Sequence, residues 1–428
     1  MFSKRLDAQD MLYLANGCLS NLLLAQDETE GWFVAAPGYR PYGDFVWHRD
    51  SAECVMALDM YASLCGRRDI FERTEKALAR SFKAIAEKEG GVKKLSEMKA
   101  KVSNPDFYDD RFHPHCRLKK DGQEVGDPWN NVQYDSVARL VVALSRHLAM
   151  SGCVGPEKFE KGLKVAASYL FDAIWDQVDG RRWLTVCANE WEEKDEPHLR
   201  GPLFSSVVGA IHAASLSVTN MQQFFPLPEV REFTQLTMDM LLGLFGEGES
   251  LKMLKRYYET AIGTCSTSLW LLTDYGIFPN DSPIFRNTVS EIVKSLYTET
   301  AREAAGGEVH FTGGLRRYLI QEASHGRYGL HYDGYWGGQA WVITTAQLSR
   351  AMAIQRRYDA AETLLKNCLE TRDAEGRLPE QFEGTFLDQR QHELWKTNTG
   401  ANTSPPWLAW SHAEVLKTYV TLREMDAI

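Results

Sequence analysis

The chain has 428 residues, of which 44% are hydrophobic and 25% charged, and its formal net charge is -10. This composition is typical of a globular protein with a large core. The acidic balance argues against a nucleic-acid or anionic-membrane partner, because both require a basic face. No run approaches the roughly 18 apolar residues of a membrane span, and the N-terminus lacks the apolar segment of a signal peptide. We therefore expect a cytoplasmic protein.

Apolar residues recur at helical spacing through twelve segments of the chain. The predicted helices lie at roughly 3–26, 49–65, 69–89, 137–148, 156–174, 201–216, 229–244, 264–274, 283–303, 341–352, 358–370 and 408–422. The connections after the odd-numbered helices are long, and most of those after the even-numbered helices are short. An Asp179-Gly180 pair predicts a small hairpin in the connection before the sixth helix.

This alternation of connections predicts antiparallel helix hairpins whose long loops all lie at one end of the molecule. Six hairpins that close into a ring form an (α/α)6 barrel, an all-α fold, and one such barrel accounts for residues 1–428 as a single domain. No sequence repeat of fixed period suggests an open solenoid instead.

The eight cysteines include no C-x-x-C pair, so neither a zinc site nor a disulfide framework is predicted. Several of them fall in apolar helical runs, as small core residues do. No cluster of side chains suits a metal ion or an organic cofactor. The expected protein needs neither.

The tryptophans indicate a carbohydrate site. Seven of the 12 fall in the predicted long loops, at Trp32, Trp47, Trp129, Trp175, Trp183, Trp191 and Trp395. A core role would favour the helices, whereas an indole face in a loop can stack on a sugar ring. In the segment 187–198, five acids lie within seven residues around Trp191, and carboxylates both hydrogen-bond hydroxyls and move protons. From this segment alone, a surface acidic turn with a half-buried tryptophan is an equal alternative.

Short motifs follow one another on successive long loops. They are Trp47-His48-Arg49-Asp50, Trp129 to Asp135, Trp191-Glu192-Glu193, Arg317-Tyr318, Gly334 to Gly338, Leu378 to Phe382, and Trp410-Ser411-His412-Ala413. In this order they resemble glycoside hydrolase family 15, the glucoamylase-like enzymes, over nearly the whole chain. The resemblance implies an (α/α)6 barrel and an inverting, exo-acting hydrolase that releases β-glucose from the non-reducing end of short α-glucosides.

The resemblance also assigns roles to individual residues. Glu192 matches the general acid and Glu380 the general base, and a nearby Trp191 and Glu193 would both raise the pKa of Glu192. The residues that match sugar contacts are Trp47, Arg49, Asp50, Trp129, Asp135, Trp191, Glu193, Arg317, Trp336 and Trp410, with Arg316 as a competitor for Arg317. A purely structural role stays open for each of these residues. The glutamates could be ordinary loop acids, Arg49 and Asp50 could be a first-turn charge and a helix cap, and the tryptophans could be core residues.

The expected partner is a small oligosaccharide. A bare barrel without an export signal suits an imported sugar, so an isomaltose-type α-1,6 link is expected, as in the small single-domain enzymes of the family. Maltose-type α-1,4 links and trehalose remain open, because Ser136 and the segment 321–331 depart from the family pattern. Glycosyl transfer also remains open, if the site excludes water. The oligomeric state is not predicted.

Two rival functions belong to other classes. A non-catalytic sugar-sensing module would not need both Glu192 and Glu380, and both are present. Another (α/α)6 enzyme, such as a sugar epimerase, would be centred on histidine pairs. His113 and His115, or His325 and His331, do not form a convincing pair by their spacing.

Overall fold

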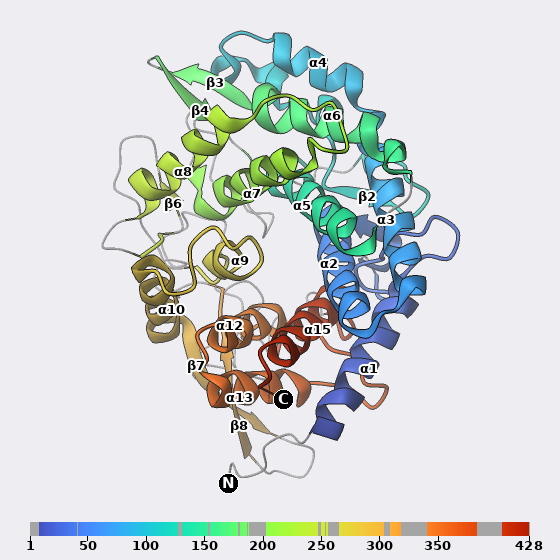
Figure 1. Cartoon of the computed structure of the whole chain (residues 1–428), viewed down its shortest axis with the longest axis vertical. Coiled ribbons are helices and arrows are strands. Elements are labelled where there is room, and N and C mark those ends of the chain that lie inside the picture. The colour runs from blue at the N-terminus through green and yellow to red at the C-terminus, as the bar shows by residue number, and fades with distance from the viewer. Residues whose placement is uncertain are drawn as a thin grey trace.

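The computed structural model describes residues 8–40, 42–126, 131–152, 155–178, 180–185, 187, 203–246, 250–252, 254–255, 265–303, 309–317, 340–382 and 405–427. Six of the described helices form an inner ring: α2 (His48–Cys65), α5 (Tyr134–Ser151), α7 (Ser205–Met221), α9 (Ser268–Thr273), α12 (Val342–Ile354) and α15 (Ala409–Glu424). Each packs against the next, and α15 packs back against α2, so the ring is closed (Figure 1).

Six further helices lie outside this ring: α1 (Ala8–Ala25), α3 (Arg68–Ala86), α6 (Glu160–Ser168), α8 (Arg231–Phe245), α10 (Pro283–Leu296) and α13 (Tyr358–Leu369). Each of them follows or precedes an inner helix in the chain, and the two kinds alternate (Figure 1). The (α/α)6 barrel predicted from the helix spacing is therefore confirmed.

Burial separates the inner helices from the outer ones. The outer helix α3 buries one face, which includes Leu78, Phe82 and Ile85, and leaves its charged face in solvent. The inner helix α15 is buried on every side from Ala409 to Leu422, because it has a neighbour on each flank and an outer helix behind it. Polar residues that occur on all faces of an inner helix must therefore pair inside the protein.

Two elements differ from the sequence prediction. The segment predicted as a long connection before residue 130 contains α4 (Glu89–Glu97), whose apolar side is only Val92 and Leu95. The helix predicted to end near residue 303 ends at Leu296, and β7 (Tyr297–Glu303) follows and pairs with β8 (Val309–Leu315). The run Tyr297-Thr-Glu-Thr explains the second difference, because aromatic and β-branched residues favour strands.

Three shorter strand pairs lie in the connections between helices. The hairpin predicted at the Asp179-Gly180 turn is confirmed as β3 (Trp175–Val178) and β4 (Arg181–Leu184). The pair β1 (Phe45–Trp47) and β2 (Arg117–Lys119) leads directly into α2. The pair β5 (Leu203–Phe204) and β6 (Leu254–Lys255) leads into α7. Two of the six inner helices thus begin where a strand ends.

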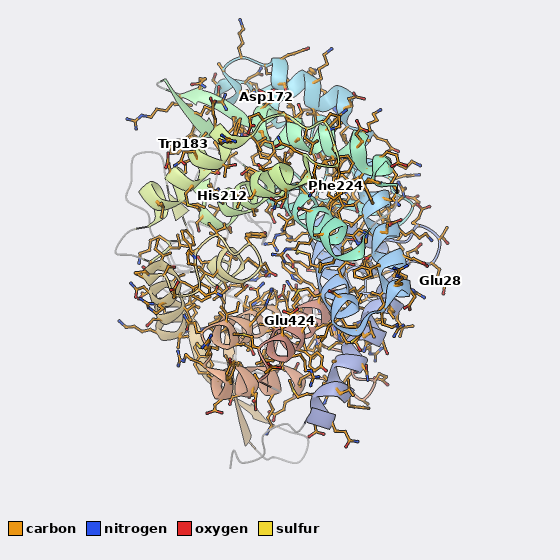
Figure 2. All side chains as sticks on the ribbon, viewed as in Figure 1. Glu28, Asp172, Trp183, His212, Phe224 and Glu424 are labelled. Carbon is orange, nitrogen blue, oxygen red and sulfur yellow. The ribbon has the colours of Figure 1, made fainter. Side chains whose placement is uncertain are left out.

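The two ends of the ring differ. The inner helices begin at the end that carries the long connections, and α2 and α5 close at Gly66 and Gly152, whose positive φ of 66° and 61° permits a tight turn. In Figure 2, the labelled residues Phe224 and Glu424 mark where two inner helices end. Phe224 lies just beyond α7, and Glu424 is the last residue of α15. Among the described residues, no helix combines the length and the apolar character needed to cross a membrane.

One buried histidine has both ring nitrogens engaged. Nε2 of His113 lies 2.7 Å from the Phe107 carbonyl oxygen, and Nδ1 lies 2.8 Å from the Tyr169 hydroxyl. Because a carbonyl only accepts, Nε2 carries the proton and Nδ1 accepts from the tyrosine. Burial lowers the pKa of His113 to about 4. The folded protein therefore holds this ring neutral.

We expect His113 to make the protein sensitive to acid. As the pH falls from about 6.5 to about 4, the imidazole of His113 becomes protonated in the unfolded chain but stays neutral in the folded protein. This difference lowers the free energy of unfolding by about 3 kcal/mol. Urea unfolding at about pH 7 and about pH 4.5 should show that His113→Gln loses less stability on acidification than the wild type. An equal loss in both proteins would contradict this.

Candidate active site

The sequence motifs at the starts of α2 and α5 meet in space. Arg49 Nη1 lies 2.9 Å from Gln133 Oε1 and 3.3 Å from Asp135 Oδ2, across the interface of the two helices. Both charged side chains are buried, with 3% and 0% of their surface exposed. A buried ion pair loses hydration on folding, so its presence where two inner helices begin indicates a site that needs fixed charges.

Asp50 follows Arg49 in the first turn of α2 and is also buried. Its position has a structural reason, because the helix dipole favours a carboxylate in the first turn. Arg49 has no such reason, since a cation is disfavoured there, and it bonds to Gln133 and Asp135 at the start of α5. The N-cap of α2 is Trp47, so neither residue is the cap, and the structural alternative that stays for Asp50 is a favourable first-turn charge.

Glu380 lies in a stretch of irregular backbone between the starts of α12 and α15, and only 7% of it is exposed. The Val342 amide donates to the Glu380 carbonyl oxygen at 3.1 Å, and the Glu380 amide donates to the Pro405 carbonyl oxygen at 3.1 Å. Since α12 and α15 are neighbours in the ring, Glu380 reaches the same end as the Arg49–Asp135 pair.

Arg317 is buried against an aromatic ring. Its guanidinium carbon lies 3.3 Å from the ring centre of Trp341, and Trp341 forms a β-bridge with Gln381, the residue after Glu380. Arg316 is half-buried instead, and burial lowers its pKa. This arrangement favours Arg317 over Arg316 as the site residue, because Arg317 shares a neighbour with the Glu380 segment.

The two described tryptophans among the predicted sugar contacts are both packed. The ring of Trp410 stacks on Trp270 at 5.3 Å between centres, and only 3% of Trp410 is exposed. The ring of Trp47 stacks on Tyr42 at 5.3 Å and is 4% exposed. Little of either ring is left for a sugar face, so their geometry favours supporting the site over lining it.

The excess of loop tryptophans has a partly structural origin. Trp32 is fully buried, and its Nε1 donates to the Lys120 carbonyl oxygen at 3.1 Å. Trp175 is also buried, and its Nε1 donates to the Leu170 carbonyl oxygen at 2.8 Å. Trp32 packs in a small buried cluster with Val34 and Val46, and Trp175 packs in the main core from strand β3, so both rings have a structural role and neither is open to a sugar.

Five predicted site residues fall outside the described residues: Trp129, Trp191, Glu192, Glu193 and Trp336. The described part of the site therefore comprises Trp47, Arg49, Asp50, Asp135, Arg317, Glu380 and Trp410. Motif reasoning missed Gln133, which bonds Arg49, and Trp341, which lies under Arg317. Gln133 stands two residues before Asp135 in one motif, so its position was a usable signal. Trp341 looked like a core residue of the tenth helix.

Farther along α15 than Trp410, a lysine lies among three acids. Lys417 Nζ lies 2.6 Å from Glu53 Oε2, 2.8 Å from Asp274 Oδ1 and 2.8 Å from Glu414 Oε1, and all four side chains are fully buried. The three carboxylates have the spacing of a metal site, with ligand oxygens within 4.8 Å of one another, but the ammonium group occupies their centre. We call these four residues the Lys417 cluster.

The Lys417 cluster shifts the acidity of its members in opposite directions. Burial raises the pKa of Glu414 to about 7, although the nearby Lys417 acts to lower it. Burial also acts to raise the pKa of Asp274, but Lys417 and Arg350 outweigh it and hold this pKa well below its usual range. The Trp410 indole donates to Glu414 Oε1 at 2.9 Å, so the cluster is bonded directly to the site.

Comparison with known proteins agrees with this geometry. No protein-family model matches the chain. A curated isomaltose glucohydrolase from Kribbella flavida is 22% identical over 395 residues, which are 92% of this chain and 89% of that protein. A glycosidase solved in complex with glucose has a TM-score of 0.73 at 20% identity and covers 99% of both chains. The family 15 glucoamylase from Hypocrea jecorina has a TM-score of 0.62 at 14% identity, covering 98% of this chain and 72% of that one.

The closed double ring of helices is the fold of the glucoamylases, to which this chain is similar over nearly its whole length. The resemblance to glycoside hydrolase family 15 predicted from the sequence motifs is confirmed.

Proposed function

We propose that the protein is an inverting α-glucoside hydrolase, with Glu380 as general base and Glu192 as general acid. Its main support is the position of Glu380, a buried carboxylate at the end of the ring where the Arg49–Asp135 pair also lies. A neutral sugar needs donors and acceptors in a fixed arrangement, and buried, mutually bonded charges supply both. Arg49 and Arg317 are the donors, and Asp50 and Asp135 are the acceptors.

The proposed reaction is a single displacement. Glu192 protonates the glycosidic oxygen as the bond to the anomeric carbon breaks, and Glu380 takes a proton from the water that attacks the opposite face. The product of an α-glucoside is then β-glucose. Such enzymes hold their two carboxyl groups roughly 6.5–9.5 Å apart, which leaves room for the water.

We propose an isomaltose-type α-1,6 link as the preferred substrate. The support is the isomaltose glucohydrolase from Kribbella flavida, which aligns over 92% of this chain. Maltose-type α-1,4 links and trehalose use the same chemistry and are the nearest alternatives. We also propose that the ring forms one catalytic domain without a cofactor, since the chemistry above requires only carboxylates and water.

Proton NMR of the purified protein with isomaltose, maltose and trehalose tests this proposal, with the anomeric signals followed from the earliest times. We expect β-glucose to appear first and isomaltose to be consumed fastest. If α-glucose appeared first, Glu380 could not be the water-activating base. Binding of glucose without turnover of any of the three sugars would favour a sugar-sensing module instead.

A further inference from the structure

The residues that lead up to Glu380 belong to no helix or strand, yet their backbone is fully hydrogen-bonded. Leu378, Pro379 and Glu380 together carry five backbone donors and acceptors, because proline has no N–H. Three of the five pair with other backbone groups. The Leu408 amide donates to the Leu378 carbonyl oxygen at 2.9 Å, the Glu380 amide donates to Pro405, and the Glu380 carbonyl oxygen accepts from Val342.

The remaining two groups pair with adjacent side chains on α15. The Leu378 amide donates to His412 Nε2 at 3.0 Å, and Ser411 Oγ donates to the Pro379 carbonyl oxygen at 2.7 Å. Both side chains are fully buried. Thus two neighbouring residues in the first turn of one inner helix hold the Arg377–Leu378 and Pro379–Glu380 peptide groups, which lead up to Glu380.

The contact with the Leu378 amide fixes the tautomer of the His412 ring. Nε2 accepts a hydrogen bond, so the neutral ring carries its proton on Nδ1. Burial lowers the pKa of His412 to about 3. The ring therefore stays neutral, and keeps its accepting nitrogen, at pH values above about 3.

We propose that His412 and Ser411 are positioning residues for Glu380, which fix the direction of its carboxylate by holding the peptide groups that precede it. This inference rests on the proposed function. Irregular backbone has no ladder of neighbours to hold it, so the loss of one buried acceptor leaves an orphan N–H and lets the segment shift. A shift of about 1 Å at a catalytic group costs about 100-fold in rate.

The first test separates kcat from KM. We expect His412→Leu to lower kcat by about 10- to 100-fold and to change KM by less than about threefold, since Glu380 acts on the water and not on sugar binding. The side-chain oxygen of His412→Gln reaches the position of Nε2, so this variant should recover most of the loss. Ser411→Ala should give a smaller loss of the same kind. As a matched control, Leu422→Ala removes buried contacts farther along α15 and should lower stability while leaving kcat unchanged.

A double-mutant cycle tests whether His412 acts through Glu380. In the background of Glu380→Gln, adding His412→Leu should cause little further loss, because the group that it positions is already inactive. A full additional loss in that background would overturn the inference. So would equal losses of kcat in His412→Leu and His412→Gln, which would mark a role in packing alone.

Hydrogen exchange followed by mass spectrometry supplies a readout that needs no activity. Amides of residues 376–382 should exchange faster in His412→Leu than in the wild type, and His412→Gln should restore protection. Unchanged exchange would overturn the inference whether or not the enzyme is active.

A wild type that hydrolyses no α-glucoside would refute the proposed function alone. Normal kcat with fast exchange would refute the positioning role alone. If His412→Leu does not fold, Ser411→Ala decides by the same two measurements.

Discussion

Replacing Glu380 with glutamine is expected to lower kcat by about 1,000-fold or more and to change KM by less than about threefold. Glutamine keeps the shape of the side chain, and the bonds of the Glu380 backbone to Val342 and Pro405 do not involve the carboxylate. It cannot take a proton from water, however. Initial rates on isomaltose measure the effect, and Glu375→Gln, an exposed acid on the same segment, is the matched control.

Glu192→Gln should give a different signature. A general acid is needed most when the leaving group is a poor one, so this variant should lose activity on isomaltose but retain much more on a 4-nitrophenyl α-glucoside. The loss in Glu380→Gln should be similar on both substrates. If the two variants depended on the leaving group in the reverse way, the two roles would have to be exchanged. Near-normal activity in either variant would remove that residue from the mechanism.

Replacing Lys417 with methionine is expected to lower the free energy of unfolding by about 3–5 kcal/mol, because it removes the cation of Glu414 and leaves Glu53 and Asp274 paired only with Arg139 and Arg350. Glu53, Asp274 and Glu414 each bond to the ammonium group at 2.6–2.8 Å and have no solvent access. Urea unfolding measures the loss. Lys83→Met, at an exposed position on α3, should change stability by less than about 0.5 kcal/mol.

The same variant gives a second, independent signature. Without the ammonium group, the three carboxylates retain oxygens within 4.8 Å of one another, a spacing that suits a divalent cation. Calcium should therefore raise the stability of Lys417→Met and leave the wild type unchanged. A loss of stability below about 1 kcal/mol, with no response to calcium, would show that water or proton uptake replaces the lysine without difficulty.

The ring was predictable because its signals are local. Helical spacing and the alternation of connection lengths both survive in a single sequence, and they gave the inner and outer helices within a few residues. The strand pair β7–β8 was missed because the segment 297–303 continues an apolar pattern from α10, and the choice between helix and strand there depends on a partner strand at 309–315. Two buried apolar residues were too few to predict α4.

The site was predictable only where a motif named the residue. Glu380 was predicted from its motif. The hydrogen bond from the Leu378 amide to His412, however, joins residues 34 positions apart, and no sequence pattern indicates it. The Lys417 cluster was hidden for the same reason, since its members look like ordinary charged residues of three separate elements: α2, the end of α9, and α15. Charges inside a closed ring cannot be told from surface charges until the ring itself is known.

The closure of the ring by α15 bears on how the chain folds. The bond between Lys417 and Glu53 joins residues 364 positions apart, and α15 is the last described helix of the chain. Until α15 docks against α2, two acids at the centre lack their lysine, and the segment of Glu380 lacks the two side chains that hold it. Contacts of such long range fold slowly, so the barrel should acquire its stability and its active site together, in one late step after synthesis of α15.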